Sequence, residues 1–214
     1  MKGIYFDEVH SYKDLNLILS SVSIPPATAK TNYIDIPGAD GSIDLTEAHG
    51  TVRYKNRNCS FVFSVFPYED FEEKKKQISN LLNGRRCKIK LDKDDDYYWL
   101  GRCSVNNYAS NKNLHKITVN ATVEPYKYKV EETAVDVSLN GSTAVQVILT
   151  NGRKAVCPTI TCSNDNTLFT VGVLEFTLSK GTHKVLDFQL QEGETTVSIK
   201  GTGTVNIKYR EGDL

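Results

Sequence analysis

The chain has 214 residues, and its 26 Lys and Arg residues balance its 26 Asp and Glu residues, so its formal net charge is zero. This length accommodates one large β domain or two small domains. Balanced charge without basic clustering argues against sequence-specific nucleic-acid binding and against binding to a membrane surface. No run of about 18 apolar residues is present, which excludes a membrane-spanning helix.

The cysteine pattern and the absence of common catalytic motifs restrict the possible function classes further. An odd, scattered set of cysteines without a Cys-x-x-Cys pair is typical of reduced, mostly buried thiols in the cytosol. The sequence has no Gly-x-Ser-x-Gly motif and no glycine-rich phosphate loop before a helix. It therefore predicts no enzyme, no catalytic residue, no cofactor and no metal site. The five cysteines are Cys59, Cys87, Cys103, Cys157 and Cys162.

In chain order, the first strong signal is a glycine-rich corner within residues 34–47. Pro37 removes a backbone donor, and Gly38 and Gly41 allow positive φ, so the chain is predicted to turn here. The segment that leaves the corner, residues 42–46, alternates apolar and polar residues with the strand period. We expect a β corner within the first domain, with no ligand bound to it.

Four later segments of the first half are predicted as strands, because they alternate or are rich in β-prone residues. One of them begins with the aromatic run Tyr97-Tyr98-Trp99. We interpret this run as two core side chains and one at an interface, rather than as a stacking platform. The predicted strands are residues 59–66, 87–91, 97–105 and 116–124.

Residues 69–83 predict a single amphipathic helix of about four turns. Acidic residues fill its first turn, lysines follow, and Gly84 supplies the residue after its end. Glu72 and Lys76 are expected to pair at i,i+4 on the solvent face. The apolar stripe of this helix consists of Phe71, Ile78, Leu81 and Leu82.

The acidic run 92–96 lies between two predicted strands and is interpreted as a solvated hairpin tip. A calcium-binding EF-hand loop that starts at Asp92 needs Gly at its sixth position and Glu at its twelfth. Tyr97 and Cys103 occupy those positions. The run is therefore not predicted to bind calcium.

The composition changes near residues 127–133, from charged and aromatic to rich in Thr, Val, Gly and Ser. We place a domain boundary there, which gives domains 1–130 and 131–214. Many short strands separated by turn signals predict an antiparallel β-sandwich in the second domain. The predicted fold class is mainly β: an N-terminal β-barrel-like sheet domain with one α-helix, then the sandwich. The predicted sandwich strands are residues 134–139, 144–149, 159–162, 168–171, 175–178, 183–189, 195–200 and 205–209.

The order of these features resembles the distal tail proteins of long, non-contractile-tailed bacteriophages and related prophages. The resemblance covers nearly the whole chain and depends on the order and spacing of several short motifs. These motifs are the corner at 34–41 with 44–47, the helix end at 81–84, residues 98–102, the close of the first half at 123–127, and residues 151–158 and 201–214.

The resemblance implies a structural protein of the virion tail, assembled in the bacterial host cytoplasm. The first domain would form a hexameric ring, with rings possible back to back, and the second would be a galectin-like sandwich. The partners would be the tail tube protein on one face and a tail tip or fibre protein on the other. Head-to-tail contacts close such rings, and edge strands are natural sites for them. Asp94, Asp95 and Asp96 would then face the lumen, where negative charge keeps passing DNA from sticking.

Two alternatives stay open at this point. The first is a carbohydrate-binding module for host-surface glycans, which needs exposed aromatic residues on the second domain. The second is a tail-fibre type of hydrolase, which needs acidic or triad residues that converge in a cleft. The second domain has no Trp, and its few aromatic residues lie in predicted strands, which argues against glycan binding. These aromatic residues are Phe169, Phe176, Phe188 and Tyr209.

Overall fold

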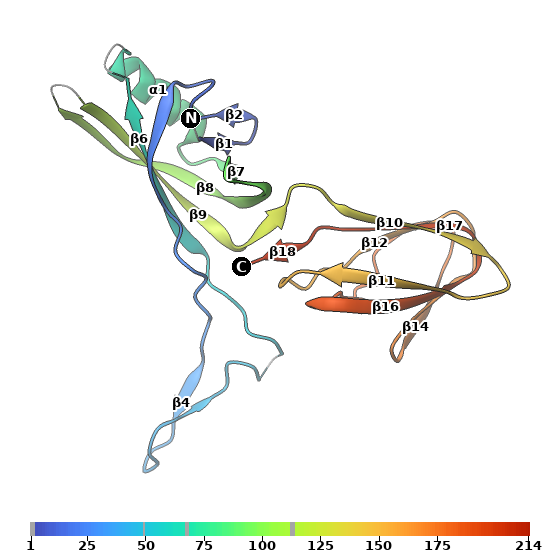
Figure 1. Ribbon diagram of the computed structural model, residues 1–214. Helices are drawn as coiled ribbons and strands as arrows, with labels where there is room; N and C mark the ends of the chain where they lie inside the picture. Colours follow the sequence, from blue (N-terminus) through green and yellow to red (C-terminus); the bar gives the residue numbers. More distant parts are fainter. Residues whose placement is uncertain (1–2, 49, 67–68, 112–113) are drawn as a thin grey trace. The chain divides into compact units, whose positions relative to one another are not determined.

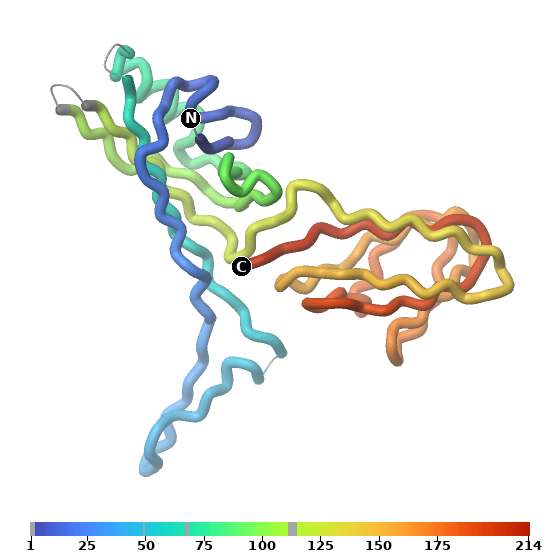
Figure 2. The backbone as a smooth tube through the Cα atoms, in the orientation of Figure 1, coloured from blue at the N-terminus to red at the C-terminus, as the bar shows by residue number. Residues whose placement is uncertain are grey.

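The computed structural model describes residues 3–48, 50–66, 69–111 and 114–214. The chain divides into two compact units, Met1–Lys127 and Tyr128–Leu214. Figure 1 labels elements of both units where there is room, and Figure 2 traces the backbone from the N-terminus to the C-terminus. Within the described residues, no helix is long and apolar enough to cross a membrane.

The first unit is built on a curled sheet whose strand order is β2-β1-β7-β8-β9-β6-β3. Short β18 (Gly212–Asp213) also pairs with β9, whose last residues belong to the second unit. The registers of β1 with β2 and β7, of β7 with β8, and of β6 with β3 and β9 are antiparallel. The strands are β1 (Ile4–Phe6), β2 (Val9–His10), β3 (Leu17–Ser23), β6 (Arg57–Val65), β7 (Arg86–Leu91), β8 (Asp94–Asn111) and β9 (Leu114–Lys129).

The core of the first unit follows from the strand period. In β6, Phe61, Phe63 and Val65 point inward and are buried, while Val62 and Ser64 between them are half-exposed. The partner strand β9 contributes Ile117 and Val119 to the same core. Each predicted strand of the first half lies within an observed strand or extends one residue past its end, and the mainly β fold class is confirmed.

The predicted helix is α1 (Phe71–Leu82), and it is the only helix in the part of the chain that the structure describes. It begins where the Asp70 side chain accepts hydrogen bonds from the N–H groups of Glu72 and Glu73. Glu72 pairs with Lys75 at i,i+3 rather than with Lys76, so the predicted i,i+4 pair is wrong. The predicted stripe packs on the sheet: two of its residues are buried and two are partly buried. They are Ile78 and Leu82, and Phe71 and Leu81.

Residues 128–214, all of which are described, form two antiparallel four-stranded sheets around a shared core. Their strand orders are β10-β17-β12-β15 and β11-β16-β13-β14. The sequence predicts turns at 140–141 and 201–203, and the chain crosses from one sheet to the other at both places. The strands are β10 (Thr133–Asn140), β11 (Val145–Asn151), β12 (Thr159–Cys162), β13 (Thr167–Val171), β14 (Leu174–Leu178), β15 (Gly181–His183), β16 (Gly193–Lys200) and β17 (Thr202–Tyr209).

One predicted sandwich strand, residues 183–189, is wrong beyond its first residue. The strand β15 ends at His183, and a turn follows in which the Phe188 N–H bonds to the Val185 carbonyl at 3.0 Å. Phe188 is buried in the sandwich core, while Leu186 is exposed. The apolar residue Phe188 enters the core from a loop, so the segment after His183 does not form a paired strand.

Candidate functional site

Residues 24–56, which we call the arm, connect β3 to β6 and carry a small hairpin (Figure 1). The outgoing and returning segments are joined near their base by two backbone hydrogen bonds. The Lys30 N–H donates to the Arg53 carbonyl at 2.7 Å, and the Lys55 N–H donates to the Thr28 carbonyl at 2.8 Å. The arm is therefore a paired ribbon and not a structureless loop.

The hairpin of the arm consists of β4 (Tyr33–Asp35) and β5 (Ser42–Asp44), which form a separate two-stranded sheet. The predicted corner joins these strands, and Gly38 and Gly41 adopt the positive φ values of 85° and 75° that the turn requires. The prediction of a turn at this position is therefore confirmed.

Four large apolar side chains of the hairpin are exposed, and we call them the apolar arm tip. The alternation in β5 does not produce burial here, because a lone two-stranded ribbon has no second layer to pack against. Such a hairpin is only marginally stable in water by itself, and clustered exposed apolar side chains mark interaction sites. The apolar arm tip consists of Tyr33 (57% exposed), Ile34 (49%), Ile36 (45%) and Ile43 (49%).

Polar contacts hold the same hairpin in shape. The Ser42 hydroxyl donates to the Asp35 carboxylate at 2.6 Å, and the Thr46 N–H donates to the Asp44 carboxylate at 2.9 Å. The hydrogen bonds from Thr46 lower the pKa of Asp44. The tip is thus ordered by local contacts while its apolar face stays open, which suits it to bind another protein surface.

The acidic run between β7 and β8 is only partly a solvated tip. The turn is formed by Asp92 and Lys93, while residues 94–96 already belong to β8. Asp94 pairs with Lys127 at 3.0 Å, and Asp92 is half-buried. Of the three predicted lumen residues, Asp95 and Asp96 are exposed. The interpretation of the whole run as solvated is therefore wrong for Asp92 and Asp94, whose carboxylates are engaged.

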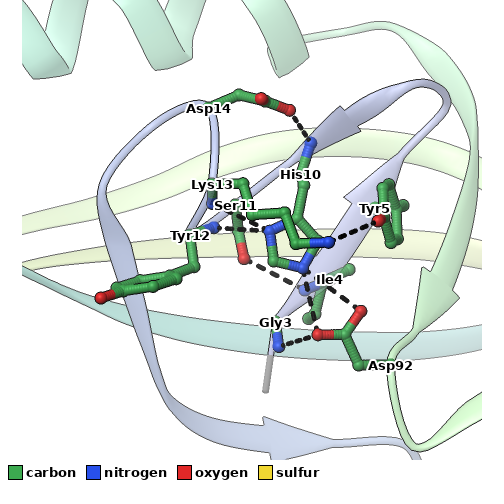
Figure 3. Close-up of polar contacts among 9 residues, drawn as sticks. All are labelled: Gly3, Ile4, Tyr5, His10, Ser11, Tyr12, Lys13, Asp14 and Asp92. Carbon is green, nitrogen blue, oxygen red and sulfur yellow. Dashed lines mark hydrogen bonds and ion pairs between the residues drawn. The ribbon is translucent and has the colours of Figure 1, made fainter. Parts of the chain in front are cut away.

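Asp92 is part of a polar network around buried His10, shown in Figure 3. The Nδ1 atom of His10 accepts backbone N–H groups from Tyr12 at 3.1 Å and Lys13 at 2.9 Å. The proton of a neutral ring must then lie on Nε2, which donates to Asp92 at 3.1 Å. Gly3 N–H donates to the same carboxylate at 2.6 Å.

This network ties the N-terminal hairpin β1–β2 to the β7–β8 turn. Burial acts to raise the pKa of Asp92, but the hydrogen bonds from His10 and Gly3, with the charge of Lys13, outweigh it and lower the pKa. A side chain at Gly3 would meet the His10 ring at 2.5 Å, so only glycine fits there. The arrangement resembles part of a catalytic dyad, but all of its polar atoms serve to hold strands together. Sequence reasoning missed it because His10 and Asp92 are 82 residues apart.

An open groove of about 690 Å³ lies over β7, β8 and β9. Its charged side chains are engaged: Arg86 pairs with Glu124, and Arg102 donates to the Gly84 carbonyl. Among the described residues, no group of three or more His, Cys, Asp and Glu is placed to hold a metal ion. The charged side chains of the groove are thus paired with one another or with the backbone of its wall.

The run 97–99 and the aromatic residues of the second unit do not form an exposed stacking platform. In the run 97–99, Trp99 is buried and Tyr97 and Tyr98 are half-buried, so the prediction of two core residues is wrong by one. Lys127 lies over the Tyr97 ring at 4.2 Å, and Lys88 over the Tyr98 ring at 5.2 Å. In the second unit, all four aromatic residues of 131–214 are buried or half-buried: Phe169, Phe176, Phe188 and Tyr209.

Comparison with known proteins identifies the fold. No protein-family model matches the sequence, and no curated protein matches it. The crystal structure of the Dit protein (gp 19.1) of SPP1 does match, with a TM-score of 0.71 and 16% sequence identity over 98% of this chain and 99% of that chain. That protein is described as a paradigm of the hub adsorption apparatus in phages that infect Gram-positive bacteria. The chain has the fold of a phage distal tail protein over nearly its whole length.

Proposed function

We propose that this chain is a structural hub protein of a phage or prophage tail, and that six copies form a ring between the tail tube and the tail tip or baseplate. The observation that carries the proposal is the match of both units to the SPP1 hub protein, which spans 98% of this chain. The predicted domains 1–130 and 131–214 are the ring-forming domain and a galectin-like sandwich in this proposal. The proposed location is the virion tail, after assembly in the host cytoplasm.

The apolar arm tip is the proposed contact between neighbouring subunits. A closed cyclic ring needs a head-to-tail contact, in which a patch on one subunit binds a different patch on the next. Ile34, Ile36 and Ile43 form such a patch, because Ile34 pairs across the hairpin with Ile43 and Ile36 follows on the same face. The free edges of the curled sheet, β3 and β2, are candidate receivers, since edge strands readily pair with another chain.

The ring faces would bind the tail tube protein on one side and a tip or fibre protein on the other. In this arrangement Asp94, Asp95 and Asp96 line the lumen, where negative charge repels the phosphates of passing DNA. Exposure of Asp95 and Asp96 supports this placement. Replacing all three with Asn should slow DNA delivery while rings still form, and unchanged infection kinetics would contradict the lumen placement.

The proposal includes no catalysis. The alternative, a carbohydrate-binding module, loses support because the aromatic residues of the sandwich are buried or half-buried rather than arranged on its surface. A glycan array probed with the purified chain distinguishes the two functions. Binding to a defined host glycan would favour the alternative, and the absence of binding would remove it.

Ring formation is tested with the purified full chain by light scattering at several concentrations and by negative-stain imaging. The expected result is a six-fold ring for the native chain and loss of the ring for the double variant Ile34→Glu and Ile43→Glu. Val173→Glu is the matched control, because Val173 is a fully exposed apolar residue (107%) in the second unit. A chain that stays monomeric at every concentration, also beside its tube partner, would contradict the hub proposal.

A further inference from the structure

Two buried thiols of the first unit lie against each other on neighbouring strands. The Sγ atoms of Cys87 on β7 and Cys103 on β8 are 3.1 Å apart. Cys87 lies opposite Gly101 in the strand register, so Cys103 is its diagonal neighbour on the same inward face. A disulfide bond is about 2.05 Å long, so the two sulfurs need to approach by only about 1 Å to form one.

We propose that Cys87 and Cys103 form a redox modification site, at which a peroxide-class oxidant converts the thiol pair into a disulfide. Both side chains are buried, with 4% and 0% of their surface exposed. A small oxidant such as hydrogen peroxide is therefore the appropriate class, and larger disulfide reagents would be excluded.

The environment of the pair decides which sulfur reacts first. The hydrogen bond with Cys103 lowers the pKa of Cys87, against the opposing effects of burial and of Asp7. The same bond, together with burial, raises the pKa of Cys103. The thiolate is the reactive form of cysteine, so Cys87 is the attacking thiol and Cys103 the resolving one.

The chemistry takes place in two balanced steps. The Cys87 thiolate attacks one oxygen of hydrogen peroxide, so that an S–O bond forms and the O–O bond breaks. The hydroxide released takes up the proton that Cys87 lost on becoming a thiolate, so that water and a sulfenic acid result. The Cys103 sulfur then attacks the Cys87 sulfur, so that the S–S bond forms, the S–O bond breaks, and the departing hydroxide leaves with the Cys103 proton as water. Two thiols are oxidised and one peroxide is reduced to water.

The other buried thiol of this core is not equivalent. Burial raises the pKa of Cys59 to about 11, against the effect of Arg57. Cys59 therefore stays protonated where Cys87 is activated, and oxidation is expected to select the Cys87–Cys103 pair. If the chain is a virion component, as the proposed function has it, the pair is reduced in the host cytoplasm and closes after release into an oxidising environment.

The test uses the purified, fully reduced native chain, exposed to hydrogen peroxide without denaturant, then alkylated in denaturant, digested and analysed by mass spectrometry. The expected result is a linked Cys87–Cys103 peptide and a loss of about 2 Da per chain, the mass of the two hydrogens removed. The thermal unfolding midpoint of the first unit should rise by about 5–10 °C, because the bond restricts the unfolded chain, and a reductant should reverse the rise.

Two variants sharpen the test. Cys103→Ala should abolish both the 2 Da loss and the rise in midpoint, and leave Cys87 to be trapped as a sulfenic acid. Cys59→Ala is the matched control and should keep both effects. Recovery of Cys87 and Cys103 as separate alkylated thiols in the native chain, or a link to a different cysteine, would overturn the proposal. The peptide map of the native chain decides this even if a variant fails to fold, and it does not depend on ring formation.

Discussion

The arm hairpin and the sandwich are both made of antiparallel strands with alternating apolar residues. These residues are buried in the sandwich and exposed in the arm hairpin. In the sandwich, Phe169 on β13 and Val197 on β16 are buried between the two sheets. In the hairpin, Ile34 and Ile43 face each other across β4 and β5 and remain exposed. An apolar alternation therefore predicts which face of a strand favours burial. Whether that face is buried within the same chain depends on a second layer of structure that packs against it.

The largest expected effect is the difference in the free energy of unfolding between a variant of the sandwich core and a variant of the arm. Phe169→Ala should lower the free energy of unfolding by about 3–5 kcal/mol, because it leaves a cavity between the two sheets. Ile34→Ala should change it by no more than about 0.5 kcal/mol, because the side chain is half-exposed. Chemical denaturation measures both values. A destabilisation of similar size for the two variants would mean that the arm tip is packed within the same chain.

The next effect is the loss of thermal stability when a glycine is replaced by alanine, compared between the sheet and the arm. A Cβ atom at Gly101 would lie 2.6 Å from the backbone of Thr122 and Val123, so Gly101→Ala requires the strands β8 and β9 to move apart. Gly38 has open space around it, and Gly38→Ala costs only the strain of a positive φ, about 1 kcal/mol. Thermal unfolding should show a clearly larger loss for Gly101→Ala. Equal losses would contradict the close strand approach at Gly101.

The smallest effect depends on pH and compares Asp92 in the sheet with Asp44 in the arm. The folded pKa of Asp92 lies below its unfolded value of about 3.9, so its stabilising contribution is present above pH ~4 and is lost as the pH falls through the folded pKa. The unfolding midpoint of Asp92→Asn should therefore lie below that of the native chain at pH 7, and the gap should close below pH ~4.

Asp44→Asn is the control for this measurement. Its carboxylate also has a lowered pKa, but it is fully exposed, and its partner Thr46 is only two residues away. The global unfolding midpoint of Asp44→Asn should stay within error of the native value over the whole pH range. A gap for Asp92→Asn that persists unchanged at pH 3 would mean that the stabilisation comes from packing and not from its charge.

Several features could be predicted from neighbouring residues alone. The helix, predicted over 69–83 and observed over 71–82, follows from its apolar stripe and its acidic first turn, and the strands of the first half follow from their alternation and β-prone composition. The turn at Gly38 and Gly41 follows from their conformational freedom. These signals are local, because capping, helical period and positive φ each act within a few residues. The resemblance to a tail hub, based on the order of such signals, was confirmed at the level of the fold.

Other features depended on contacts between distant residues. No local pattern pairs His10 with Asp92, places Cys87 beside Cys103, or sends the chain across to the other sheet at Gly201. The same holds for the exposure of Ile34, which alternates as a core residue does and yet has nothing to pack against. Local propensity sets the type of each element, but burial and side-chain pairing follow from which elements come together in space. For that reason the exposure of the apolar arm tip and the thiol pair became visible only in the folded chain.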